Sequence, residues 1–126
     1  MSPKTRNIIG WILTSLIAIV FLMSAFMKLT GSEAAIKGAA ALGLTADTLR
    51  IVGIIEVLSI LLFIIPRTGM LGTLLVAAYL GGAIATHLEH HESVMAPVII
   101  QCVVWITATI RFPELSRRLM GKSLNV

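Results

Sequence analysis

The chain has few charged residues and almost no cysteine. Of its 126 residues, 13% are charged, 6% are aromatic and one, Cys102, is a cysteine. A single cysteine excludes both a disulfide and a dithiol relay within one chain. The low charge is atypical of a soluble domain, which needs a polar surface. No basic face with interleaved aromatic residues is present, so the sequence does not indicate nucleic-acid binding.

Apolar residues make up 57% of the chain and gather in four long runs. These runs predict membrane-spanning helices at about 8–27, 49–65, 68–86 and 94–112, each near the ~17 to 25 residues that a bilayer requires. The first run is too long for the apolar core of a cleaved signal peptide, ~7 to 15 residues. Short links between the later runs predict antiparallel neighbours. We expect one all-α domain, residues 1–126, that forms an integral membrane antiparallel four-helix bundle.

The connection between the first two predicted spans is the longest one. Ser32 is a typical helix N-cap, and Gly43 is a typical residue at a helix C-terminus. The segment between them carries enough apolar residues to lie in the membrane interface. We therefore predict a short interfacial helix here.

Positive charges predict the orientation of the chain. Cytoplasmic loops of membrane proteins carry an excess of lysine and arginine. One predicted side of the membrane holds most of these residues, whereas the other side is close to neutral. Both termini should be cytoplasmic, where the basic tail can contact anionic lipids. The residues on the basic side are Lys4, Arg6, Arg67, Arg111, Arg117, Arg118 and Lys122.

Glu56 lies inside the second apolar run, about 9 Å from the outer face at ~1.5 Å per residue. A charge in the hydrocarbon region costs roughly 2.5 to 3.5 kcal/mol on insertion scales. Neither packing nor snorkelling suits a carboxyl group at this depth. Glu56 is therefore the first candidate for a functional residue.

Other polar residues share the outer half of the predicted bundle with Glu56. Their positions predict a small polar chamber that opens to the outer side. The most favourable internal ion pair joins Glu56 with either Lys28 or His87, because an opposite charge lowers the cost of burial. Each residue except Glu56 also suits a structural role, such as packing or a bond between helices. The candidate binding or network residues are Ser24, Lys28, Glu56, Tyr79, His87, Gln101 and Trp105.

Small residues recur at four-residue spacing in the third span. Ala77, Gly81 and Ala85 form one row, and Ala78 and Gly82 lie one step around the helix. This spacing is typical of close helix packing in membranes. It predicts a helix–helix seam, within the chain or between two copies. We expect Gly53 of the second span and Gly69 and Gly72 of the third to serve the same purpose.

The run Glu89-His-His-Glu92 suggests metal binding at first sight. Adjacent histidines in a short loop point in different directions and offer no fixed ligand geometry. We expect no metal site here.

Four short motifs resemble the DoxX-like family: Ser24-Ala-Phe-Met-Lys28, Gly53-Ile-Ile-Glu56, Pro66-Arg-Thr-Gly69 and Ala83-Ile-Ala-Thr-His87. The resemblance covers essentially the whole chain. It implies a small four-span protein of a bacterial inner membrane, and it singles out Ser24, Lys28, Glu56 and His87. The superfamily includes a subunit associated with thiosulfate:quinone or quinol oxidase activity. Other members resemble accessory partners of redox enzymes, and distant animal relatives act as chaperones or cargo receptors in the endoplasmic reticulum.

Polar clustering without a complete catalytic set predicts an accessory or assembly protein, not an enzyme on its own. We expect membrane lipids and a protein partner or second copy around it, and a quinone or lipid headgroup in the chamber. One alternative is a quinone-linked oxidoreductase subunit in which Glu56 and His87 pass protons. Another is a small proton-coupled transporter, although four spans are few for alternating access.

Overall fold

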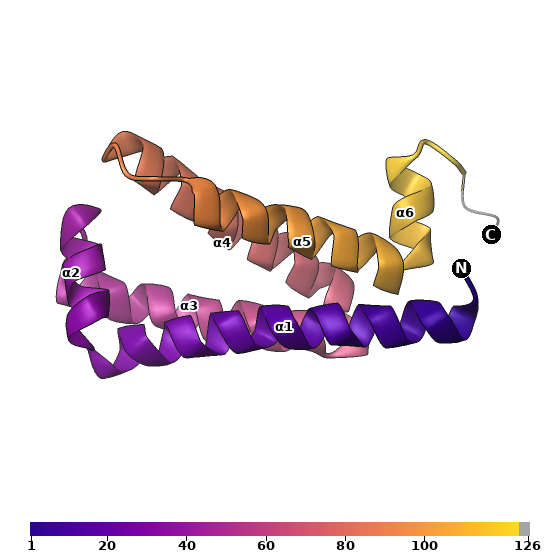
Figure 1. The fold of residues 1–126 in the computed structure, drawn as a ribbon, viewed down its shortest axis with the longest axis horizontal. Coiled ribbons are helices and arrows are strands. Elements are labelled where there is room, and N and C mark those ends of the chain that lie inside the picture. Colours follow the sequence, from indigo (N-terminus) through magenta and orange to yellow (C-terminus); the bar gives the residue numbers. More distant parts are fainter. Residues whose placement is uncertain (124–126) are drawn as a thin grey trace.

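The computed structural model describes residues 1–123, and helices account for most of them (Figure 1). No strand occurs within this range. The all-helical prediction is therefore confirmed. In chain order the helices are α1 (Pro3–Thr30), α2 (Glu33–Ala41), α3 (Ala46–Ile64), the short 3-10 helix η1 (Pro66–Thr68), α4 (Gly69–Glu89), α5 (Met95–Arg111) and α6 (Pro113–Leu119).

The boundary between α1 and α2 follows from three residues. Gly31 ends α1 in the left-handed region, with φ at 67°, a conformation that glycine adopts without steric cost. The Ser32 side chain then accepts a hydrogen bond from the backbone N–H of Ala35 and caps α2. A single turn thus separates the two helices, and the short helix predicted in this connection is present.

Two stretches are long and apolar enough to cross a membrane, Pro3–Thr30 and Pro66–Glu89. A third would be α5 with α6, but the two are bent by 113° at Phe112. The 19 residues of α3 include three charged ones, Asp47, Arg50 and Glu56, and every stretch of 18 residues within this helix contains all three. The structure therefore supports two or three of the four predicted spans.

The four longest helices pack in a closed circuit. α1 lies against α3 and α5, and α4 lies against the same two helices. The buried core takes residues from all four: Ile17, Phe21, Ile60, Phe63, Val76 and Val104. In Figure 1 the α4–α5 pair lies close to α1 and α3 near the termini and diverges from them toward α2.

Glycines explain the close approach near the termini. A Cβ atom at Gly72 would lie 2.1 Å from the backbone nitrogen of Phe63, and one at Gly69 would lie 2.3 Å from the ring of Phe112. Only glycine fits at such contacts. Farther along α4, a Cβ atom at Gly81 or Gly82 would meet no heavy atom within 4 Å. The predicted seam is therefore formed by the first two glycines of α4 and not, within this chain, by Gly81 and Gly82.

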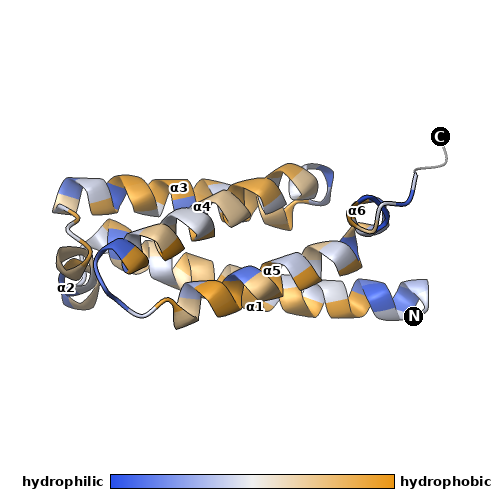
Figure 2. Ribbon diagram, turned by 90° about the horizontal axis from the view of Figure 1, so that it is seen from above, coloured by the Kyte–Doolittle hydropathy of each residue, from blue (hydrophilic) through white to orange (hydrophobic). Residues whose placement is uncertain are grey.

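The long helices consist mostly of apolar residues (Figure 2), and many of these residues lie on the outer surface. Large hydrophobic side chains stand exposed on all of them, including Phe26 at 68%, Leu58 at 58%, Leu74 at 61% and Ile99 at 54%. Soluble monomers rarely expose contiguous apolar patches of this kind. A surface of this composition is stable in lipid.

Candidate functional site

An ion pair joins α1 to α3. The Lys28 Nζ donates to Glu56 Oε2 at 2.8 Å, and the same nitrogen donates to Ser24 Oγ at 2.5 Å. The Glu56 side chain is 4% exposed, whereas that of Lys28 is 21% exposed. Of the two predicted partners for Glu56, the structure therefore selects Lys28 over His87.

A glycine on α3 makes this contact possible. Gly53 and Glu56 are three residues apart, so they lie on the same face of the helix. A Cβ atom at Gly53 would lie 3.2 Å from the Lys28 Cβ and 3.2 Å from the Leu29 side chain. The missing side chain lets the end of α1 approach α3 closely enough for Lys28 to reach the carboxylate.

Tyr79 of α4 completes the polar group. The Lys28 Nζ lies 5.9 Å from the centroid of the Tyr79 ring, which is within cation–π range. The Tyr79 hydroxyl is also near enough to the Glu56 carboxylate to interact with it. The Tyr79 ring also packs on the Phe21 ring, with centroids 5.7 Å apart. We call Ser24, Lys28, Glu56 and Tyr79 the Lys28 cluster.

The other predicted residues lie apart from this cluster. The His87 Nδ1 is 2.6 Å from the Ala83 carbonyl of its own helix. The Gln101 Nε2 donates to the Ala77 carbonyl of α4 at 3.1 Å, and its buried Oε1 has no hydrogen-bond partner in the described part of the chain. Among residues 1–123, no hydrogen bond or ion pair joins His87, Gln101 or Trp105 to the cluster. Gln101 therefore connects α5 to α4 and does not contribute to the polar group.

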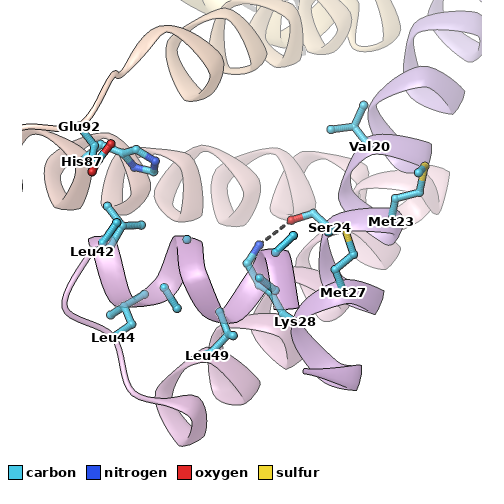
Figure 3. Close-up of a pocket in the computed structure, with 15 residues that line it drawn as sticks. Val20, Met23, Ser24, Met27, Lys28, Leu42, Leu44, Leu49, His87 and Glu92 are labelled. Carbon is cyan, nitrogen blue, oxygen red and sulfur yellow. Dashed lines mark hydrogen bonds between the residues drawn. The ribbon is translucent and has the colours of Figure 1, made fainter. Parts of the chain in front are cut away.

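A pocket of about 630 Å³ lies beside the Lys28 cluster (Figure 3). Lys28 and Ser24 form part of one wall, and His87 and Glu92 face them from the end of α4 and the loop after it. The cluster members Glu56 and Tyr79 lie behind Lys28 and do not line the pocket. The remaining lining residues are apolar or small: Val20, Met23, Met27, Ala34, Ala35, Gly38, Ala39, Ala41, Leu42, Leu44 and Leu49.

Helix α2 supplies a wall of this pocket, which sequence reasoning did not anticipate. Its contributions are small residues, among them Ala35, Gly38 and Ala39. The connector after α2 is fixed against the opposite loop, because a Cβ atom at Gly43 would lie 2.9 Å from the His90 ring. Gly43 has a φ of 71°, so this position favours glycine for its backbone as well. The alanines and the glycine among residues 34–41 were the available signal for a surface that leaves room beside it.

The pocket combines a mostly apolar interior with four polar side chains, those of Ser24, Lys28, His87 and Glu92. An ammonium group has three N–H donors, and Lys28 uses two of them on Ser24 and Glu56. The third can serve an acceptor atom of a molecule whose hydrocarbon part fills the pocket. Within residues 1–123, histidine, cysteine and acidic side chains form no group of three or more that could hold a metal ion.

Arg111 forms a second polar contact between helices, which the sequence analysis counted only as a charge. Its Nη1 donates to the Phe63 carbonyl at 2.7 Å, and its Nη2 donates to the Ile64 carbonyl at 3.2 Å. These carbonyls belong to the last turn of α3, where no helical N–H remains to satisfy them. The guanidinium also lies about 5 Å from three aromatic rings, those of Trp11, Phe63 and Phe112. Arg111 thus fixes the end of α5 to the end of α3.

Comparison with known proteins gives one match. The model of a family described as the DoxX-like family matches residues 12–110, a range that contains the whole Lys28 cluster. No curated protein and no solved structure matches the chain.

Proposed function

Because this chain belongs to the DoxX-like family, we propose that it is a four-span protein of a bacterial inner membrane with both termini in the cytoplasm. Its apolar outer surface supports insertion in lipid. The excess of arginine and lysine near the start of α1 and in α6 supports a cytoplasmic position for that end. In this arrangement α1, α3, α4 and α5 form an antiparallel bundle, and α2 lies in the outer interface.

The proposed role is that of an accessory or assembly protein that holds an amphiphile, either a quinone or a lipid headgroup, in the pocket beside the Lys28 cluster. The observation that carries this proposal is an apolar pocket of about 630 Å³ with Lys28 in its wall. Binding sites for small molecules typically have an apolar lining with a few fixed polar groups. Glu56 and Ser24 hold the ammonium group in place, so that its remaining donor meets a carbonyl or phosphate oxygen without prior rearrangement.

A protein partner or a second copy of the chain would pack on the open part of α4. Ala78, Gly81, Gly82 and Ala85 are exposed there, and the space beside both glycines is free. Small residues on one helix face let a second helix approach closely in lipid.

One observation favours a quinone-linked oxidoreductase subunit as a second candidate. Glu56 and Tyr79, two groups that can exchange protons, lie directly behind the Lys28 ammonium, and His87 lines the pocket opposite. A redox titration of the reconstituted protein would test this role. Absence of a bound or exchangeable quinone would exclude it.

The main proposal is tested by native mass spectrometry of the protein released gently from its own membrane. We expect a co-purifying quinone or lipid on the parent chain and its loss from Lys28→Gln. Lys37→Gln is the matched control, because Lys37 is an exposed residue of α2 that does not line the pocket. A third variant, Gly38→Leu, fills the pocket without changing charge, since nothing lies within 4 Å of its Cβ position. If Lys28→Gln and Gly38→Leu both kept the same bound molecules as the parent, the pocket would not be the binding site.

A further inference from the structure

A second pocket, of about 270 Å³, lies at the opposite end of α1 from the Lys28 cluster. It is built where the first turns of α1, the link after α3 and the end of α5 meet. Its volume equals roughly nine water molecules at about 30 Å³ each. Most of its lining lies outside residues 12–110, the range that matches the family. The lining residues are Pro3, Arg6, Asn7, Trp11, Pro66, Ile110, Arg111 and Phe112.

All of the charge in this lining is positive. It contains two arginines, Arg6 and Arg111, and no acidic residue. The acidic residue nearest in sequence, Glu114, belongs to α6 and is not part of the lining. Two guanidinium groups around one small pocket repel each other unless an anion lies between them.

Several hydrogen-bond donors in this pocket have no acceptor within residues 1–123. The side chains of Arg6, Asn7 and Trp11 make no hydrogen bond in this part of the chain. A guanidinium has five N–H donors, and Arg111 gives one from each terminal nitrogen to the carbonyls of Phe63 and Ile64. Those two bonds hold Arg111 in position while leaving donors for a ligand.

We propose that this pocket binds the phosphate group of an anionic phospholipid. Paired arginine forks match the oxygen atoms of phosphate in geometry as well as in charge. A soluble phosphate ester offers the same group, but the surroundings favour a lipid. Ile8 and Ile12, which follow the lining residues Asn7 and Trp11 in α1, are 50% and 55% exposed. Trp11 itself is 39% exposed and is typical of the aromatic residues found at membrane interfaces.

A bound phosphate would add a connection between the start of α1 and the end of α5, beside the contacts that these helices already make there. Arg6 and Asn7 come from the start of α1, whereas Arg111 comes from the end of α5 and is bonded to the end of α3. The lipid phosphate would therefore link the start of α1 to the end of α5 and, through Arg111, to the end of α3. Its contribution should appear as a gain in thermal stability as well as in binding.

The test is a lipid titration of the full chain in neutral detergent, with bound lipids counted by native mass spectrometry. Phosphatidylglycerol and phosphatidylcholine with the same acyl chains are compared on the parent, Arg6→Gln and Lys4→Gln. Lys4 is the matched control, because it carries the same charge two residues away but does not line the pocket. We expect one phosphatidylglycerol to bind more tightly than phosphatidylcholine. Arg6→Gln should weaken it roughly fivefold or more, and Lys4→Gln should leave it nearly unchanged.

Two further arms separate the sources of phosphate and the role of the guanidinium. Inorganic phosphate and glycerol 3-phosphate are added to the lipid-loaded parent. If they displace the lipid at low millimolar concentration, and this depends on Arg6, the occupant is a soluble phosphate. Arg6→Lys keeps the charge but loses the fork, so its affinity should fall between those of the parent and Arg6→Gln. Equal weakening by Lys4→Gln and Arg6→Gln, or equal binding of the two lipids, would overturn the proposal.

Discussion

Removing one member of the Lys28–Glu56 pair should destabilise the fold more than removing both. In Glu56→Leu the ammonium group would keep only Ser24 as a hydrogen-bond partner. Breaking a buried ion pair in this way costs about 3 to 5 kcal/mol. The Lys28 side chain is 21% exposed and can extend toward headgroups. We therefore expect the lower end of that range, about 3 kcal/mol.

Lys28→Met and the double variant complete a double-mutant cycle with Glu56→Leu. Lys28→Met leaves a carboxyl group that is 4% exposed without its cation, and it should also cost about 3 kcal/mol. Replacing a buried pair with apolar residues of similar volume is often neutral or stabilising. The double variant Lys28→Met/Glu56→Leu should therefore lie within about 2 kcal/mol of the parent, well short of the sum of the two single losses.

Reversible unfolding in mixed micelles, followed by the loss of helical circular dichroism, measures all four free energies of unfolding. Ser59→Ala is the control, because Ser59 is buried on the same helix but lies outside the pair. Additive losses in the double variant would refute the reasoning, since they would mean that Lys28 and Glu56 stabilise the fold independently.

Three other substitutions test contacts between helices, each through the thermal stability of the protein in detergent. Gly72→Ala should lower the free energy of unfolding by about 3 kcal/mol or more, because its Cβ would lie 2.1 Å from the Phe63 nitrogen. Gly81→Ala is the matched control and should be neutral or slightly stabilising, because its Cβ meets nothing within 4 Å. Equal changes in stability for the two variants would contradict the packing described. Arg111→Gln should cost about 2 to 4 kcal/mol, since two carbonyls of α3 lose charged donors, and an unchanged melting temperature would argue against that contact. The free energy of unfolding of Gln101→Leu should lie within about 1 kcal/mol of that of the parent, because the lost hydrogen bond to Ala77 is offset by removal of a buried oxygen with no partner in the described residues. A large loss of stability would contradict this balance.

Periodicity and hydropathy predicted the helices well because both are local properties of the sequence. Gly31 and Ser32, for example, place the boundary between α1 and α2 by their own backbone preferences. The pairing of Lys28 with Glu56 was within reach as well. Depth along each helix left two cationic candidates for the carboxylate, and the structure selected one of them.

Side-chain direction across helices was the part that the sequence did not determine. Gln101 and Trp105 lie at the right depth for the chamber, yet the rotation of α5 turns Gln101 to the Ala77 carbonyl. The wall formed by α2 depends on how that helix folds back, which alanines alone do not specify. From the sequence, Arg111 indicates only the cytoplasmic side of the membrane. Its hydrogen-bond partners are backbone carbonyls of α3, which every residue type carries, so no sequence pattern predicts this contact.

The tight contact between Gly72 and Phe63 lies near the first turn of α4, and it holds this end of the α4–α5 hairpin against α3. The 21 residues of α4 span about 31 Å at ~1.5 Å per residue, and the pocket beside Lys28 lies toward the far end of that length. Glu89 lies 17 residues beyond Gly72, about 26 Å along the helix, so a tilt of roughly 5° about Gly72 would move the far end of α4 by about 2 Å. A change in packing at Gly72 would therefore alter the width of the pocket mouth without any change in the residues that line the pocket.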